Sequence, residues 1–573
     1  MKPLRLPWPL WTPKLLDALQ AYDRRALAAD LIAGITVGVV ALPLAMAFGI
    51  ASGVAPQAGI YTAVVGGFIV SLLGGSRLQI GGPTGAFVVI VSGIVAAHGL
   101  SGLLMVTMMA GVILIALALT GLGQAVKFLP RPVVIGFTNG IALLIASTQI
   151  KDFLGLPIAE PPSAFLPRMT AIAAAASQLS VPAVLLGVGS LLLVLFAPRR
   201  LPRVPGSILA LAAGTAAVFA FDLPVETIGS RFGGIPRELP PLHIPAFRAD
   251  LIVPLLPSAF TVALLAAVES LLSAVVADSL SGDRHDSRAE LMAQGVANLF
   301  SPLVGGIPVT GAIARTATNF RSGARTPVAG LIHALTLLAV VLLLAPLAAY
   351  VPLATLAAVL FVVAYNMGEW REIGSIWRLE WADRSVWLFT FALTVMADLT
   401  IAVEVGVALA ALLYIRRVSG TTAVSQLNAD DIEAGRVHVL QDRQVPPYVS
   451  ILRIHGPFLF GTTDKLDEVT AHVSALPPIV ILRLRHMTVI DASGLHAIER
   501  LADRLRHSGR TLILCGAREQ PARIFAQADL ARHVGANNLV PNIEDALARA
   551  RDVAAQFSGL GDETARDLAT AAI

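Results

Sequence analysis

The chain has 573 residues, of which 55% are hydrophobic and 14% are charged. Soluble globular proteins carry about 25% charged residues, so this composition excludes an ordinary soluble enzyme and indicates a polytopic membrane protein. The formal net charge of +4 does not indicate a nucleic-acid partner, and the single cysteine, Cys515, excludes an intramolecular disulfide and a cysteine metal cluster.

Residues 1–29 read as a cytoplasmic N-terminal segment without a removable signal peptide, because no short apolar core precedes a small-residue cleavage site. Residues 30–417 form the expected transmembrane domain. Fourteen apolar runs are predicted as its segments, at residues 31–50, 57–73, 83–97, 101–121, 132–149, 181–197, 206–221, 254–278, 289–304, 309–319, 327–349, 353–365, 385–399 and 401–415.

Basic clusters such as Arg24–Arg25, Arg199–Arg200 and Arg416–Arg417 separate these runs. With fourteen segments, every cluster falls on the side of the N-terminus. The positive-inside rule then predicts that both termini are cytoplasmic.

The charge frequency rises abruptly after Arg417. Residues 418–435 are expected to form a linker, residues 436–555 a small α/β domain and residues 556–573 a polar tail. The expected strands and helices of this domain are strands 437–440, 448–454, 479–484 and 511–515, and helices 464–476, 493–508, 521–528 and 543–551.

Two glycine- and proline-rich stretches, residues 81–86 and 305–312, interrupt the apolar runs and share the triplet Thr-Gly-Ala. Backbone that leaves a helix inside a bilayer must be buried in protein or line a cavity. The pair predicts two half-helices in a seven-plus-seven inverted repeat, with their N-termini facing each other at a binding site.

Helix N-termini present free N–H donors and partial positive charge, so the two breaks predict a site for a small anion. Gly85 and Gly311 allow close backbone approach, and Thr84 and Thr310 offer hydroxyl donors. The alternative is that these small residues only allow close packing of membrane helices.

Arg315 follows the second break by one helical turn and would add a full positive charge to the anion site. The alternative is that its side chain extends to the cytoplasmic surface beside Arg321. Glu269 is the lone acid of an apolar run, and Ser273 lies four residues later on the same helical face.

Glu269 is predicted to couple transport to a cation, either by binding H⁺ or by binding Na⁺ together with Ser273 and groups near Thr310. The alternative is a structural ion pair with Arg315. No catalytic motif is present in the sequence, and neither an enzyme activity nor a further cofactor is expected.

The stretches Asp30–Gly53, Pro56–Tyr61, Gly305–Asn319, Arg325–Gly330 and Ala397–Gly406 resemble the sulfate permease (SulP) family, which includes the animal proteins pendrin and prestin. The resemblance implies a bacterial inner-membrane transporter, a homodimer, and core and gate domains with elevator-like alternating access. It also implies two groups of site residues, an anion site at Thr84, Gly85, Ala86, Phe87, Val309, Thr310, Gly311, Ala312 and Arg315, and a coupling acid at Glu269. Leu44 stands where many relatives have glutamine, which removes a polar substrate contact.

The sequence around Met487–Leu495 resembles the STAS domain of anti-sigma-factor antagonists. The resemblance implies phosphorylation at Ser493, and the alternative is that Ser493 caps a helix. The domain is expected to serve dimer assembly, trafficking or a cytoplasmic partner.

The expected function is secondary active transport of sulfate or bicarbonate, coupled to H⁺ or Na⁺. The alternatives are an uncoupled anion exchanger or channel, a dicarboxylate transporter of the same family, a nucleobase carrier with the same inverted fold, and a membrane-tethered regulator that acts through the STAS domain.

Overall fold

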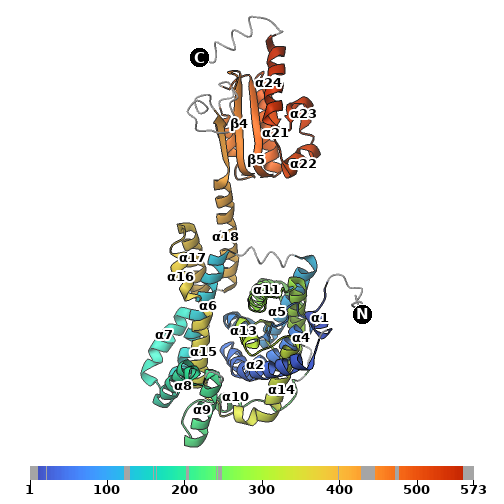
Figure 1. Ribbon diagram of the computed structural model, residues 1–573. Coiled ribbons are helices and arrows are strands. Elements are labelled where there is room, and N and C mark those ends of the chain that lie inside the picture. Colours follow the sequence, from blue (N-terminus) through green and yellow to red (C-terminus); the bar gives the residue numbers. More distant parts are fainter. Residues whose placement is uncertain are drawn as a thin grey trace. The chain divides into compact units, whose positions relative to one another are not determined.

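The computed structural model describes residues 11–558, apart from 21, 122–129, 159–160, 163, 202–204, 241, 243–244, 246–247, 398, 428–444 and 472–475. Contacts divide the chain into two units, residues 1–410 and 411–573. The first unit is helical, and the second contains a five-stranded sheet (Figure 1). The prediction of a polytopic helical domain followed by a small α/β domain is confirmed.

The helical unit consists of two halves, each of which contains one short strand. The first half comprises α1 (Lys14–Leu19), α2 (Arg24–Ala51), α3 (Pro56–Tyr61), the π-helical turn η1 (Thr62–Gly66), α4 (Gly67–Leu73), β1 (Gly81–Gly82), α5 (Gly85–Thr120), α6 (Arg131–Leu154), α7 (Phe165–Ala175), α8 (Val181–Arg200) and α9 (Gly206–Phe221). The second half comprises α10 (Ile228–Phe232), α11 (Ile252–Ser281), α12 (Ser287–Phe300), η5 (Ser301–Val304), β2 (Thr310–Gly311), α13 (Ile313–Arg321), α14 (Val328–Ala348), α15 (Leu353–Met367), α16 (Trp370–Ile376), α17 (Trp381–Met396) and α18 (Leu399–Thr421).

Seven helices of the described part are long and apolar enough to cross a membrane, and the bent pair α7–α8 would make an eighth. Helix α5 covers two of the expected segments. They are separate helices that meet at a kink at Gly99, where the backbone leaves the helical conformation with a φ of 68°. The count of fourteen also includes shorter and broken helices, and it stays a prediction.

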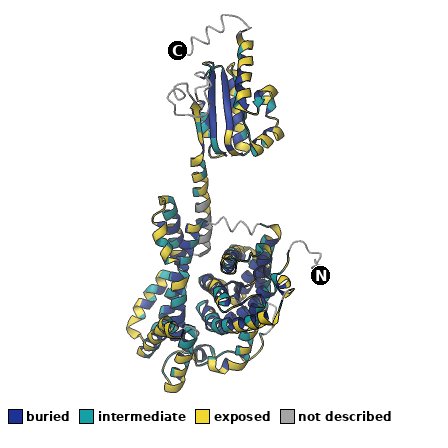
Figure 2. Cartoon of the chain, viewed as in Figure 1, coloured by how far each residue is buried: buried dark blue, intermediate teal, exposed yellow. Residues whose placement is uncertain are grey.

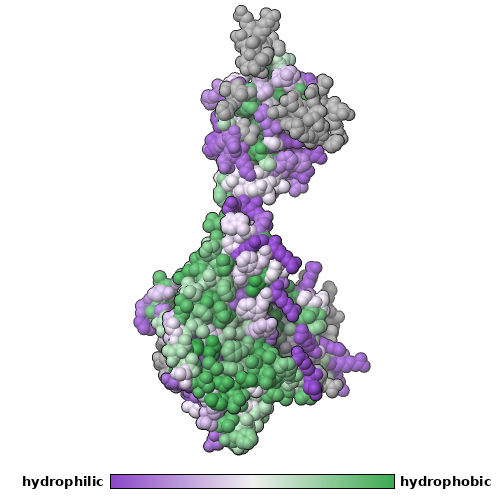
Figure 3. All heavy atoms as spheres, turned by 90° about the vertical axis from the view of Figure 1, so that its left-hand side faces the viewer, coloured by the Kyte–Doolittle hydropathy of each residue, from purple (hydrophilic) through white to green (hydrophobic). Residues whose placement is uncertain are grey.

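Large apolar side chains cover much of the outside of the helical unit, as Figure 3 shows for one face. Examples from helices α8, α9 and α14 are Leu185, Phe219, Phe221 and Leu343, which are 68%, 69%, 76% and 68% exposed. A soluble protein does not expose a continuous apolar surface of this kind, whereas a surface in contact with lipid requires one.

Helix packing separates two groups of helices within this unit (Figure 1). The first helix group contains both breaks and pairs α2 with α14, α5 with α11 and α12, and α11 with α13. The second helix group pairs α6 with α15 and α17, and α8 with α9 and α15. Fewer contacts join the groups, mainly between α5 and α6 and between α2 and α15.

The C-terminal unit contains a sheet in the order β3-β4-β5-β6-β7, in which β3 is antiparallel to β4 and the other pairs are parallel. Its elements are β3 (Ala423–Leu427), β4 (Val449–Phe458), α20 (Asp464–Val469), β5 (Ile479–Ile490), α21 (Ala492–His507), β6 (Thr511–Cys515), α22 (Glu519–Gln527), α23 (Ala531–Val534), β7 (Leu539–Val540) and α24 (Ile543–Ser558). One face of the sheet packs on α20–α23 and the other on α24, so the central strands are buried between them (Figure 2).

The prediction of a linker at residues 418–435 is wrong for residues 418–427. Helix α18 continues to Thr421, and residues 423–427 form β3, which pairs with β4 over five residues from Ala423↔His455 to Leu427↔Ile451. The expected strand at 437–440 and most of the expected tail, residues 559–573, lie outside the described residues.

Cys515, at the end of β6, is buried against α24. Burial raises the pKa of its thiol from 9.0 to about 12, so the thiolate fraction at pH 8 is roughly a thousandfold lower than for an exposed cysteine. We expect maleimide labelling at pH 8 to be correspondingly slow, and to accelerate as the pH rises toward 12 or when the unit unfolds. A Cys515→Ser/Ser493→Cys variant, with its thiol on the exposed start of α21, should label rapidly; equal rates would contradict the burial of Cys515.

Candidate functional site

The two predicted breaks meet in a short antiparallel bridge. Strand β1 pairs with β2 in the register Gly81↔Gly311 and Gly82↔Thr310, and the Ala312 N–H donates to the Ile80 carbonyl at 2.9 Å. Helix α5 begins three residues after Gly82, and α13 begins two residues after Gly311. The bridge supplies hydrogen-bond partners for backbone N–H and C=O groups, which lipid could not supply. It also brings the first turns of both half-helices close together.

A cavity of about 430 Å³ lies at these helix starts. The first helix group contributes the α5 start, one face of α11 and the α13 start, and the second helix group contributes α6 and the end of α15. Six of the predicted site residues line it, namely Thr84, Gly85, Ala86, Glu269, Ala312 and Arg315. The cavity therefore lies between the two helix groups.

Arg315 lies in the first turn of α13 and is 4% exposed. Its Nη2 donates to the Pro83 carbonyl, which precedes α5, so the guanidinium spans the space between the two helix starts. Among the described residues it forms no ion pair within 4.0 Å. The alternative of an extended side chain at the surface beside Arg321 is therefore wrong, because Arg315 points into the protein while Arg321 is exposed.

Glu269 of α11 faces the same cavity and accepts a 2.7 Å hydrogen bond from the Thr84 hydroxyl. This is the only hydrogen bond to the Glu269 carboxylate within the described part of the chain. The carboxylate and Arg315 line one cavity without forming a direct ion pair, so the alternative of a structural pair is wrong in this conformation. Both side chains therefore remain available to a ligand.

Thr310 and Ser273 lie near the site, but their hydroxyls are engaged elsewhere. The Thr310 hydroxyl donates to the Ala266 carbonyl at 3.1 Å and lies 2.9 Å from the Ser270 hydroxyl. Ser273 donates to the Thr316 hydroxyl at 3.1 Å. Neither side chain lines the cavity, and both hold β2 and α13 against α11.

Three further predicted residues stabilise the surroundings of the cavity. Phe87 is fully buried in the main apolar core of the unit. The Val309 N–H donates to the Asn298 side chain at 2.9 Å, and its carbonyl accepts from the same amide at 2.8 Å. The Gly311 N–H donates to the Ser270 hydroxyl at 3.1 Å. These residues fix the position of the helix starts rather than line the cavity.

The structure adds a buried polar network that the sequence analysis missed. The carboxylate of Glu290 on α12 accepts hydrogen bonds from Gln79, Gln294 and the Gly75 N–H, at 2.7, 2.9 and 3.1 Å. Gln79 also donates to the Ser270 carbonyl at 3.2 Å. With these three hydrogen bonds, the Glu290 carboxylate holds the extended chain before β1 in place. A polar residue before the first break, such as Gln79, was the only sequence signal for the network.

The second helix group also brings polar side chains to the cavity that the sequence analysis missed. They are Thr138 of α6, Asn366 of α15 and Glu369, which precedes α16. Their distance in sequence from the two breaks does not identify them as site residues. They reach the cavity only because α6 and α15 pack against the first helix group.

Gly82 is the position where the bridge requires glycine. Its φ is 144°, and an added Cβ would lie 2.6 Å from Nη1 of Arg315. We expect Gly82→Ala to cost about 1–3 kcal/mol of backbone strain and to displace Arg315, which should lower both the thermal unfolding midpoint and anion uptake. Gly93→Ala on α5, where an added Cβ meets nothing within 4 Å, is the matched control. Unchanged uptake by Gly82→Ala would contradict this account of the bridge.

The C-terminal unit places Ser493 as an exposed residue in the first turn of α21. The helix cap is Asp491, whose side chain accepts from the Gly494 N–H at 2.8 Å. The expectation that Ser493 is the cap is therefore wrong. Phosphorylation of Ser493 stays a prediction.

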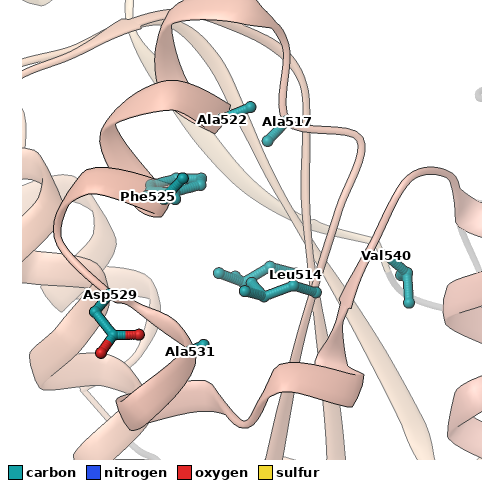
Figure 4. Close-up of a pocket in the computed structure, with 9 residues that line it drawn as sticks. Leu514, Ala517, Ala522, Phe525, Asp529, Ala531 and Val540 are labelled. Carbon is teal, nitrogen blue, oxygen red and sulfur yellow. The ribbon is translucent and has the colours of Figure 1, made fainter.

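A second cavity, of about 290 Å³, lies in the C-terminal unit between β6, α22, α23 and β7. Its lining is almost entirely apolar, as Figure 4 shows for Leu514, Phe525 and Val540. Its one carboxylate, Asp529, forms an ion pair with Arg532. The lining of this cavity contains no nucleophilic side chain, and its one carboxylate is engaged by an arginine.

Comparisons with known proteins agree with this organisation. The profile described as "Sulfate permease family" matches residues 27–390, and the STAS domain profile matches residues 441–546. The chain is 44% identical to YvdB of Bacillus subtilis (strain 168), over 90% of this chain and 96% of YvdB. The name of YvdB describes it provisionally as a sulfate transporter. It is 31% identical to the bicarbonate transporter BicA of Picosynechococcus sp. (strain ATCC 27264 / PCC 7002 / PR-6), over 92% of this chain and 95% of BicA.

The structure of the murine Solute Carrier 26 family member A9 anion transporter superposes with a TM-score of 0.83, at 18% identity, over 95% of this chain and 94% of that one. At this identity the likeness shows the fold alone. The family profile spans most of the helical unit, the bicarbonate transporter aligns over nearly its whole length, and the fold is like that of the solved anion transporter. The chain belongs to the sulfate permease family and carries a C-terminal STAS domain.

Proposed function

We propose that this protein is a secondary transporter of a small inorganic anion, sulfate or bicarbonate, and that H⁺ or Na⁺ influx drives it. The anion would bind at the starts of α5 and α13 beside Arg315, and the cation would bind at Glu269. The membrane domain would cross the bilayer many times with both termini in the cytoplasm, and two copies would form a homodimer.

The observation that carries this proposal is the cavity at which two helix N-termini of the first helix group meet one guanidinium and one carboxylate of the same group. The N–H groups of a first helical turn have no partner within the helix, and with the helix dipole they favour an anion. Arg315 adds a full charge with a planar set of donors that suits oxyanions. Family membership supports the same assignment.

The coupling role of Glu269 rests on its place opposite Arg315 in the same cavity. While the carboxylate is charged, it repels an anion and attracts the guanidinium across the cavity. Binding of H⁺ or Na⁺ neutralises it and leaves Arg315 free to hold the anion. Na⁺ would find oxygen ligands at Glu269 and Thr84, whereas Ser273 and Thr310 would have to exchange their present hydrogen bonds.

The position of the cavity between the two helix groups supports alternating access by an elevator-like motion. The β1–β2 bridge and the Glu290 network join both half-helices to the first helix group, so the site would move with that group as one body. The face formed by α6 and α15 would then be the surface along which the site passes.

Purified protein in liposomes tests the function directly. We expect saturable uptake of labelled sulfate or bicarbonate that depends on an imposed inward H⁺ or Na⁺ gradient, with competition by the unlabelled anion. A comparison of the two gradients identifies the coupling ion, and a comparison of sulfate, bicarbonate and a dicarboxylate as competitors identifies the anion. Currents without gradient-dependent accumulation would instead indicate a channel.

A further inference from the structure

Two arginines lie side by side in the sheet of the C-terminal unit. Arg453 of β4 and Arg483 of β5 are cross-strand partners, on the face that α24 covers together with Ile451 and Ile481. They are 8% and 6% exposed. Neighbours in a parallel ladder project to the same side of the sheet, so two like charges are held next to each other with little water.

Within the described part of the C-terminal unit, several nitrogen atoms of this pair have no hydrogen-bond partner. Nε and Nη2 of Arg453 and Nη1 of Arg483 are buried without a hydrogen-bond acceptor in the described chain, and neither residue forms an ion pair there within 4.0 Å. Several other arginines of the same unit are paired, for example Arg504 with Asp467 at 2.5 Å and Arg506 with Asp503 at 2.8 Å. A buried charge without a partner is strongly unfavourable, so the exception requires an explanation.

The electrostatics of the pair favour the binding of an anion. Burial lowers the pKa of Arg453, and the neighbouring Arg483 lowers it further. Burial also lowers the pKa of Arg483, and Cys515 partly opposes this shift. No carboxylate of the described residues raises the pKa of either group, yet a guanidinium does not lose its proton in proteins.

Further nitrogen donors continue the cluster along the same strands. The rings of His455 and His486 stack with centroids 4.9 Å apart and planes 4° apart. Burial lowers the pKa of His486, and His455, Arg483, Arg485 and Arg518 lower it further. His486 and Arg485 are exposed, so the cluster extends from the buried arginines to the surface.

We propose that Arg453 and Arg483 bind a phosphate group, with His455 and His486 beside it, and that the C-terminal unit thereby carries an anion site separate from the transport cavity. Phosphate suits the pair because its several oxygens can accept from two planar guanidinium groups at once. The phosphate could belong to a dissolved ligand or to a lipid headgroup. The proposal does not depend on the transport function.

Hydrogen–deuterium exchange of the full-length protein tests this site, because the readout is local and separates it from the transport cavity. Inorganic phosphate is titrated onto the protein in phosphatidylcholine nanodiscs, and a parallel sample is prepared in nanodiscs that contain phosphatidylglycerol. We expect slower exchange in peptides that cover 451–456 and 481–487. Protection by dissolved phosphate identifies a soluble ligand, whereas protection only by phosphatidylglycerol identifies a headgroup.

The variant Arg453→Gln/Arg483→Gln should weaken this protection, with an apparent affinity lower by about tenfold or more, because the variant loses the charge-assisted hydrogen bonds to the phosphate. Arg506→Gln, which changes an exposed and ion-paired arginine, is the matched control and should bind as the wild type does. In phosphate-free buffer the double variant should unfold at the same or a higher temperature than the wild type, because it removes two unpaired buried charges. No protection by either phosphate source, or equal protection in the double variant, would overturn the proposal.

Discussion

Replacement of Glu269 by glutamine is expected to abolish cation-driven anion accumulation. The amide keeps the shape of the side chain and can still accept the hydrogen bond from Thr84, but it cannot take up H⁺ or bind Na⁺ as a carboxylate does. Uptake driven by an imposed gradient should fall at least about tenfold. A fall of this size requires the loss of only about 1.4 kcal/mol of interaction between the coupling cation and the carboxylate. Anion exchange without a gradient should persist, because Arg315 and the helix starts are unchanged.

The measurement is uptake into proteoliposomes at several external pH values, with and without Na⁺. If H⁺ is the coupling ion, wild-type uptake rises as the external pH falls, because protonation neutralises Glu269, and the variant loses this dependence. Asp278→Asn, which lies on the same helix and outside the cavity beside His285, is the matched control. If Glu269→Gln retained the pH and Na⁺ dependence of the wild type, the coupling assignment would be wrong.

Replacement of Arg315 by alanine is expected to weaken anion binding more than any other change to the cavity. The variant loses a charge and the donors of the guanidinium, each of which is worth about 1.5–3 kcal/mol toward a charged partner. The KM for the anion should therefore rise roughly 10- to 150-fold. Arg315→Lys should be intermediate, because lysine keeps the charge but not the planar set of donors.

Concentration-dependent uptake, with the protein yield and thermal unfolding midpoint measured in parallel, separates binding from folding. Arg321→Ala serves as the control, because Arg321 ends the same helix and is exposed. An unchanged KM in a well-folded Arg315→Ala variant would place the anion elsewhere.

The sequence was sufficient to predict the fold class because its signals are local. Runs of apolar residues, the scarcity of charge and the sharp change after Arg417 each reflect the solvent that the segment meets. The position of β3 could not be predicted in this way. Residues 423–427 become a strand because β4 offers a free edge, and this pairing partner lies more than twenty residues away in the chain.

The sequence indicated the two breaks of the candidate site but not the residue at which each half-helix begins. The shared Thr-Gly-Ala triplets suggested that Thr84 and Thr310 occupy equivalent places, but Thr84 directly precedes α5 whereas Thr310 lies within β2. Only Thr84 therefore faces the cavity, and Thr310 bonds to α11. The repeated Thr-Gly-Ala motif locates the two breaks. The hydrogen bonds of the β1–β2 bridge determine where each half-helix begins.

The residues that the sequence analysis missed depend on contacts between distant segments. Gln79 and Glu290 are 211 positions apart, and the arginines of β4 and β5 become neighbours only through the strand register. A single sequence contains no periodic signal for such pairs. Glu269 and Arg315 could be found because an isolated charge in an apolar run is conspicuous wherever it lies.

The first helix group contributes one carboxylate, Glu269, and one guanidinium, Arg315, to the cavity, and this balance has a consequence for the response to membrane voltage. These two charges cancel when the site is empty and Glu269 is ionised. Because Glu369 belongs to the second helix group, a return of the empty site with the first helix group would move no net charge. Loading with bicarbonate and one monovalent cation preserves this balance, whereas loading with sulfate and one such cation adds one negative charge. Because one charge moved through 100 mV corresponds to about 2.3 kcal/mol, sulfate transport should respond to the membrane potential and bicarbonate transport should not.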